Sequence, residues 1–202
     1  MNVRLRHEMH FTAGVYYGGQ TRMNNYTLTL WMTTNCLDAA DQNTSFERIK
    51  YFVYSELDST IFINADHETQ CQLLSAAGLN VTTMPGEPVD QLIGLMLYYK
   101  LNAITEGRMI IEETEIASTM GENMTYLHSS MEQTDITHQP DWWQAADPIH
   151  CDPDLIDTDK VLNLPKASLW RDLDLAWTTP DSAEDTGNTV VFADFKKCDD
   201  SK

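Results

Sequence analysis

The sequence is poor in basic residues. It has 13 Lys and Arg residues against 31 Asp and Glu residues, which gives a formal net charge of −18 at pH 7. A field of that sign repels phosphate backbones, and the longest basic run, Lys196-Lys197, lies among aspartates. We therefore expect no direct binding to nucleic acid.

Long apolar runs and clustered cysteines are also absent. The most apolar stretch, Leu92 to Tyr99, has eight residues, whereas a membrane-spanning helix needs about 20. The four cysteines lie far apart and form neither a CxxC pair nor a disulfide scaffold. We therefore expect reduced thiols, no membrane partner and a cytoplasmic location, in the host cytoplasm or in the virion if the gene is viral.

Motifs for common cofactors and metals are missing as well. The chain has no Gly-rich phosphate loop, no GxSxG elbow and no HExxH helix. The acidic run from Asp152 to Asp159 lacks the central glycine and the terminal glutamate of a helix-loop-helix calcium site, which favours a solvated turn. We expect no cofactor and no metal site.

The N-terminal part alternates between strand and helix periodicity. Period-two patterns and turn residues predict two hairpins and short strands, and helical spacing predicts three helices, the first with a capping box at Thr44–Glu47. The expected strands are residues 9–17, 25–32, 59–64, 79–84, 108–117 and 123–131, and the expected helices are residues 45–57, 67–77 and 88–106. These elements predict a compact α+β domain over residues 1–131, with an antiparallel sheet packed by two or three helices.

The composition changes beyond residue 131. Residues 131–202 carry 16 acidic and six basic side chains and four of the five tryptophans. Acidic segments with scattered aromatic residues usually lack a core of their own. We expect residues 132–202 to form a mostly irregular acidic extension, with one candidate last strand at residues 188–195.

The exposure of the large apolar side chains of this extension to water would be unfavourable. They either pack on the chain's own domain or anchor the extension on a protein partner, because buried aromatic residues are the usual energetic anchors of interfaces. The candidate partner-binding residues are Trp142, Trp143, Trp170, Leu173 and Trp177.

Histidines followed two positions later by Ser or Thr are a second feature. His10-Phe11-Thr12 and His128-Ser129-Ser130 lie on expected strands and resemble the paired motifs of 2H phosphoesterases, in which two imidazoles act as general acid and base. The catalytic candidates would be His10, Thr12, His128 and Ser130. Chance alone explains about one such match, because Ser and Thr are common in the chain.

Five segments resemble the tunnelling fold (T-fold) of the 6-pyruvoyl- and 6-carboxy-tetrahydropterin synthases. They are similar to the second strand, the first helix, an L-D-H segment, the proline-led helix and the final strand of that family. These segments are Asn25–Leu30, Phe46–Lys50, Leu57–Asn64, Pro88–Ile93 and Ile110–Thr114.

The resemblance implies a ring-like homo-oligomer and a glutamate, Glu113, that binds a purine or pterin ring. It does not extend to the chemistry of the family. Met23-Asn24-Asn25-Tyr26 stands where the family has its HGH zinc ligands, and Asp58-Ser59 stands where it has Asp-His. The resemblance therefore implies a fold without the zinc enzyme.

Three functions follow from these patterns. The first is a non-catalytic interaction or assembly protein that docks on a protein partner or on itself. Small acidic proteins of this kind are common in phages, so a phage-encoded protein is among the expectations. The second is a purine- or pterin-binding T-fold protein, and the third is a 2H-type phosphoesterase.

Overall fold

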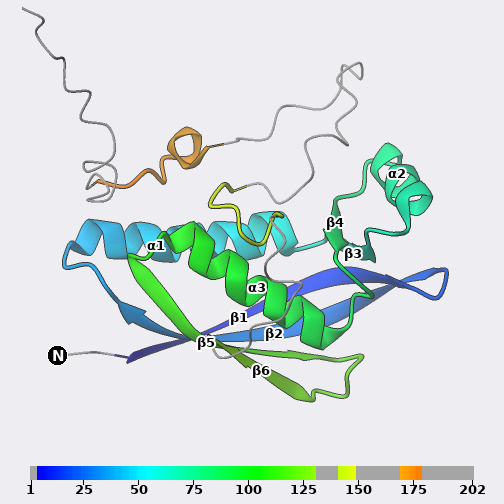
Figure 1. The fold of residues 1–202 in the computed structure, drawn as a ribbon, viewed down its shortest axis with the longest axis horizontal. Coiled ribbons are helices and arrows are strands. Elements are labelled where there is room, and N and C mark those ends of the chain that lie inside the picture. The colour runs from blue at the N-terminus through cyan, green and yellow to red at the C-terminus, as the bar shows by residue number, and fades with distance from the viewer. Residues whose placement is uncertain (1–3, 131–140, 149–168, 179–202) are drawn as a thin grey trace, which may run out of the picture.

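The computed structural model describes residues 4–130, 141–148 and 169–178. Six strands form one sheet in the order β4-β3-β1-β2-β5-β6, and Figure 1 shows α1 and α3 lying side by side on one of its faces. The elements are β1 (Arg4–Tyr17), β2 (Gln20–Thr34), α1 (Ala39–Tyr51), a π-helix η1 (Phe52–Leu57), β3 (Ile61–Asn64), α2 (Glu68–Ala76), β4 (Val81–Met84), α3 (Asp90–Thr105), β5 (Met109–Ser118), β6 (Thr125–Ser129) and a 3₁₀-helix η4 (Trp170–Leu173).

The α+β class is confirmed, but the sheet is mixed and not only antiparallel. The long β1–β2 hairpin, β2–β5 and β5–β6 are antiparallel, whereas β1–β3 and β3–β4 are parallel. Parallel neighbours need a crossover connection, and α1 with η1 and α2 provide the two crossovers. Periodicity reports the faces of a strand and not its direction, so the sequence did not reveal the parallel pairs.

The first helix begins earlier than expected. Asp38 is its N-cap, and its carboxylate accepts a hydrogen bond from the Ala40 amide at 2.7 Å. The expected capping box lies inside the helix, where the Ser45 hydroxyl donates to the Asp41 carbonyl one turn earlier. Asp38 therefore takes the role that the sequence assigned to Thr44.

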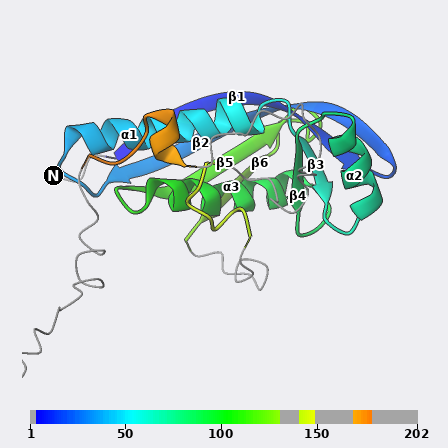
Figure 2. The same cartoon turned by 90° about the horizontal axis from the view of Figure 1, so that it is seen from above.

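The core lies between the sheet and the helices. Alternate side chains of β1 and β2, among them Met9, Phe11, Leu28 and Leu30, are buried in the core, and Figure 2 shows α1 and α3 over the sheet from above. The intervening side chains face the opposite side, which no described helix covers, and we call it the outer face. None of the described helices is long and apolar enough to span a membrane.

Candidate functional site

The two candidate catalytic histidines lie on opposite faces of the sheet. The side chain of His10 is 69% exposed on the outer face, whereas His128 is buried on the helical face, against Gly94 of α3. Residues that are paired across neighbouring strands lie on the same face of a sheet. His10 is paired with Thr27 on the outer face, whereas His128 is paired with Thr114, which is buried on the helical face. The phosphoesterase hypothesis required convergence and is therefore wrong, which also removes the roles of Thr12 and Ser130 in it.

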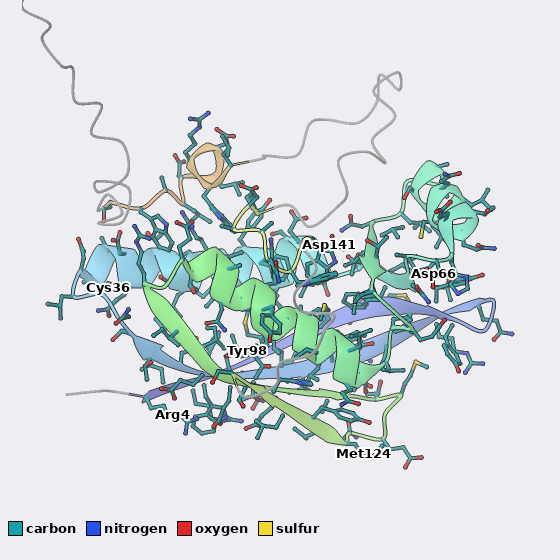
Figure 3. The ribbon with its side chains drawn as sticks, in the orientation of Figure 1. Arg4, Cys36, Asp66, Tyr98, Met124 and Asp141 are labelled. Carbon is teal, nitrogen blue, oxygen red and sulfur yellow. The ribbon has the colours of Figure 1, made fainter. Side chains whose placement is uncertain are left out.

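Glu113, the expected ligand-binding residue, lies on the outer face in a cluster of charges. Its carboxylate is 2.8 Å from Arg4, which also pairs with Glu112 at 3.0 Å. The Arg4 guanidinium lies 4.7 Å from the centre of the Trp31 ring, and Figure 3 shows Arg4 on the side of the sheet opposite the helices. A ligand at Glu113 would therefore share this carboxylate with Arg4 or displace it.

The described parts of the acidic extension lie on the helices. Residues 141–148 and 169–178, yellow and orange in Figure 1, run above α1 and α3, and we call them the strap. Trp142, Trp143 and Trp170 are no more than 6% exposed and belong to the hydrophobic core. The core therefore continues past residue 131, and of the two alternatives for these indoles the structure favours packing on the chain's own domain.

Indole N–H groups hold the two parts of the strap together and attach it to the domain. Trp142 donates to Thr83 of β4 at 2.8 Å, and Trp170 donates to Ala146. Leu173 packs at the margin of the core, and half-buried Trp177 donates to Glu106 at 2.8 Å. The candidate strand at residues 188–195 lies outside the described residues.

Lys100 of α3 is fully buried beneath the strap. Its ammonium group donates to the carbonyls of Ala145 and Asp147 at 2.8 and 2.7 Å. Burial lowers the pKa of Lys100 to about 8, against the attraction of Asp147 and Glu56. The unfolded chain, in which the pKa has its ordinary value of 10.5, therefore binds more protons between pH 8 and 10.5.

This linkage predicts a pH-dependent difference between the wild type and Lys100→Met. Stability rises with pH where the unfolded state binds more protons, so the wild type should gain up to about 3 kcal/mol relative to the variant as the pH rises from 8 to 10.5. Urea unfolding of both proteins across this range measures the difference, and taking the difference cancels the titration of Tyr and Cys. A constant difference would contradict the burial of the Lys100 ammonium group.

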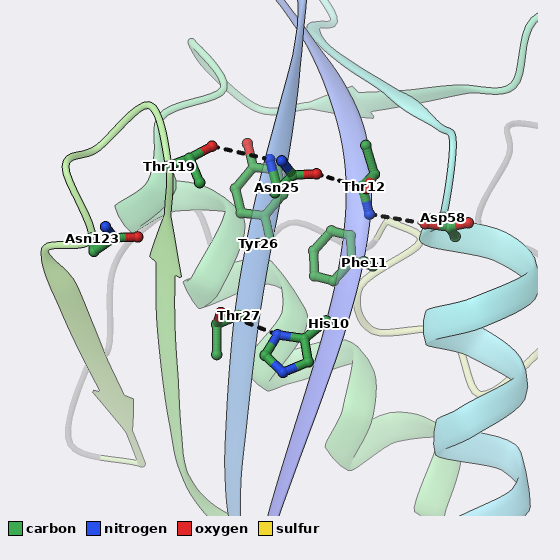
Figure 4. A pocket seen from close by; sticks show the side chains of 9 residues that line it. All are labelled: His10, Phe11, Thr12, Asn25, Tyr26, Thr27, Asp58, Thr119 and Asn123. Atoms are coloured by element: carbon green, nitrogen blue, oxygen red, sulfur yellow. Dashed lines mark hydrogen bonds between the residues drawn. The ribbon is translucent and has the colours of Figure 1, made fainter.

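A hollow on the outer face is formed by short side chains. It lies over two cross-strand pairs of the β1–β2 hairpin, His10 with Thr27 and Thr12 with Asn25. The hollow has a volume of about 320 Å³, and we call it the trough. It is lined by His10, Phe11, Thr12, Asn25, Tyr26, Thr27, Asp58, Thr119 and Asn123, as shown in Figure 4.

Hydrogen bonds fix the polar side chains of the trough. Asp58 accepts the Thr12 amide at 2.8 Å, and the Thr12 hydroxyl donates to the Asn25 side-chain carbonyl at 2.9 Å. The Nδ1 atom of His10 lies 3.2 Å from the Thr27 hydroxyl. The bonds from Thr12 to Asp58 and to Asn25 connect the end of η1 with β1 and β2. The polar side chains of the trough are therefore positioned before any ligand binds.

Among these residues, sequence motifs indicated only His10 and Thr12 as catalytic candidates, for a different role. Asn25 and Asp58 were part of the T-fold resemblance, but nothing in their spacing indicates that they meet. Strand alternation could have shown that Thr12, Asn25 and Thr27 share a face, but their pairing depends on the register of the hairpin. Within the described ranges, no three His, Cys, Asp or Glu side chains gather as a metal site.

Comparisons with known proteins gave structural matches only. No protein-family model and no curated protein matches the sequence. The 6-pyruvoyl tetrahydropterin synthase of Plasmodium vivax matches with a TM-score of 0.42 and 12% identity, over 64% of this chain and 99% of that one. An uncharacterised protein from Wolinella succinogenes matches with a TM-score of 0.45 and 10% identity, over 64% and 99%.

A third match is the 6-pyruvoyl tetrahydropterin synthase of Plasmodium falciparum, with a TM-score of 0.38 and 12% identity, over 63% of this chain and 96% of that one. The resemblance to T-fold proteins expected from the sequence is thus confirmed as a resemblance. At these scores it carries no ligand, residue role or assembly over to this chain.

Proposed function

We propose that the chain is a non-catalytic assembly protein whose copies join through the edge strand β6. The proposal rests on the contrast between the two edges of the sheet. At the β4 edge, the strap takes up the Thr83 carbonyl through the hydrogen bond from Trp142. At the other edge, β6 pairs with β5 on one side, and no strand among the described residues pairs with Thr125, Tyr126 and Leu127 on the other.

The absence of charged side chains on β6 makes this strand suitable for contact with a second copy. Proteins usually protect an open edge with charged residues, proline or a bulge, because free backbone groups recruit another strand. From Asn123 to Met131 the sequence has no Asp, Glu, Lys or Arg, in a chain with a net charge of −18. Two copies of such an acidic chain repel each other least where the surface is uncharged.

Antiparallel pairing of β6 with β6 would continue the sheet from one copy into the next. With the pairing centred on Leu127, which is 53% exposed, the two leucines would face each other on the outer face. The expected interaction surface was the acidic extension, but three of the four indoles of the extension are buried within the chain. We therefore assign the interaction to the sheet edge.

Replacing Leu127 with lysine should weaken self-association by about tenfold or more, because two like charges would face each other across the new strand pair. Sedimentation velocity over a series of micromolar concentrations measures the association constant. The matched control is Ile110→Lys, which places the same charge on an exposed apolar position of β5. A wild type that stays monomeric, or equal effects of the two substitutions, would contradict the proposal.

A further inference from the structure

We propose that the trough on the outer face binds a small uncharged polyhydroxylated molecule, of the size of one or two sugar rings. The trough and the β6 edge are separate features, so this inference does not depend on self-association. Its volume of about 320 Å³ lies at the lower end of the range found for small-molecule sites. The chemistry of the lining disfavours other classes of ligand in turn.

Charge disfavours anions. Asp58 is the one carboxylate in the lining, which contains no Lys or Arg, and the Nε2 atom of His10, the one basic side chain there, lies 3.5 Å from Glu8. The nearest outward-facing cations on β1 are already paired, Arg6 with Glu8 at 2.8 Å and Arg4 with Glu112 and Glu113. A phosphate or carboxylate would therefore meet the charge of Asp58 and compete with Glu8 for the one basic side chain, whereas a single exposed carboxylate gives a free cation little affinity.

The His10 imidazole, which is 69% exposed, is the one open ring of the trough, and it offers a planar heterocycle only a small stacking surface. The aromatic residues of the lining, Phe11 and Tyr26, stack on each other at 4.9 Å and are 3% and 1% exposed, because their rings face the helical side. Nucleobases and similar rings gain much of their affinity from stacking on an aromatic face. Apart from the His10 imidazole, the trough offers them only polar groups.

Hydroxyl groups match what the trough offers. Asn25 uses its side-chain oxygen to accept from Thr12, which leaves its NH₂ group to donate to a ligand. Asp58 can only accept, whereas the Thr12 and Thr27 hydroxyls do both. A ligand hydroxyl also donates and accepts, so several adjacent hydroxyls can satisfy this mixed set at once.

Irregular backbone at both ends of the trough supports a binding role. At one end the π-helix η1 stops at Asp58, and the next residue, Ser59, has a φ of 68°. At the other end, Glu122 and Asn123 have φ values of 55° and 60°. Non-glycine residues in this region are strained, and both this strain and π-helical turns are concentrated at functional sites.

Amide NMR of the full-length chain tests the proposal. D-glucose, D-galactose and D-mannose are each titrated to about 50 mM, because a few hydrogen bonds give a dissociation constant of roughly 1 mM. At least one sugar should shift the amide signals of Thr12, Asn25, Thr27 and Asp58 with saturation. Inorganic phosphate and adenosine, titrated in the same way, should not.

The isosteric variant Thr12→Val removes the hydroxyl that orients Asn25 and should weaken sugar binding by about fivefold or more. Valine keeps the β-branched side chain of the strand, so the fold is retained. The control is Thr33→Val, the same substitution on the outer face of β2 away from the trough. No saturable shift with any sugar, binding of adenosine or phosphate instead, or equal affinity in the two variants would overturn the proposal.

Discussion

Replacing Gly94 with alanine is expected to lower the free energy of unfolding by about 3 kcal/mol. A Cβ atom at Gly94 would lie 2.5 Å from Cγ2 of Ile116 and 2.7 Å from two atoms of the His128 ring. Both neighbours are buried in the sheet, so neither can move aside freely. Alanine in a helix interior is otherwise about 1 kcal/mol better than glycine, so the clash must exceed that gain.

Gly86→Ala is the matched control for this substitution. Its Cβ would meet only Cδ2 of Leu92, at an ordinary 3.5 Å. Denaturant unfolding should therefore show a large loss for Gly94→Ala and a change within about 0.5 kcal/mol for Gly86→Ala. Equal stability of the two variants would show that α3 does not rest on β5 and β6 at Gly94.

Local patterns predicted most of the elements, because they depend on neighbouring residues. Alternation revealed the two hairpins, and Gly107, with a φ of 74°, follows the end of α3 as expected. The directions of β3 and β4 were not visible, because they depend on how α1 and α2 cross the sheet. The error at the first helix arose because Ser and Thr side chains can bond within a helix as well as cap one, as Ser45 does beside the expected cap Thr44.

The site was less predictable, because it depends on contacts between distant residues. The prediction of a catalytic histidine pair was wrong because the two side chains lie on opposite faces of the sheet. The trough depends on the register between β1 and β2, which the spacing of residues within one strand does not give. The burial of the strap tryptophans was also not predictable, because composition describes only the acidic residues around them. It depends on the contacts that Arg48 and Lys100 make with the strap.

Arg48 connects the strap to both helices. Its guanidinium donates to the carbonyls of Leu175 and Ile104 and to the Glu106 carboxylate, at 2.8, 3.1 and 2.7 Å. The same group lies 3.6 Å from the centre of the Trp177 ring and 4.8 Å from that of Trp170. The side chain is only 3% exposed, so these partners replace water almost completely.

Arg48→Met should therefore lower the free energy of unfolding by about 2–4 kcal/mol, because it leaves two carbonyls without their donor and removes a cation from Glu106, which keeps Arg108 and Trp177 as partners. Methionine keeps much of the length of the side chain, which limits the cavity. Hydrogen exchange should also accelerate at the Leu175 and Thr178 amides, which bond to the Trp170 carbonyl and to Asp41. Amides of the β1–β2 hairpin should change less, because that hairpin does not contact the strap through Arg48.

Lys50→Met separates this effect from the simple loss of a cation on α1. Lys50 is paired with Glu47 at 2.7 Å, but both side chains are more than 40% exposed, and pairs of this kind contribute at most about 1 kcal/mol. The control should thus unfold nearly as the wild type does and keep its strap amides protected. If Arg48→Met lost no more stability than Lys50→Met, the strap would not depend on Arg48, and the acidic extension would again be available to a partner.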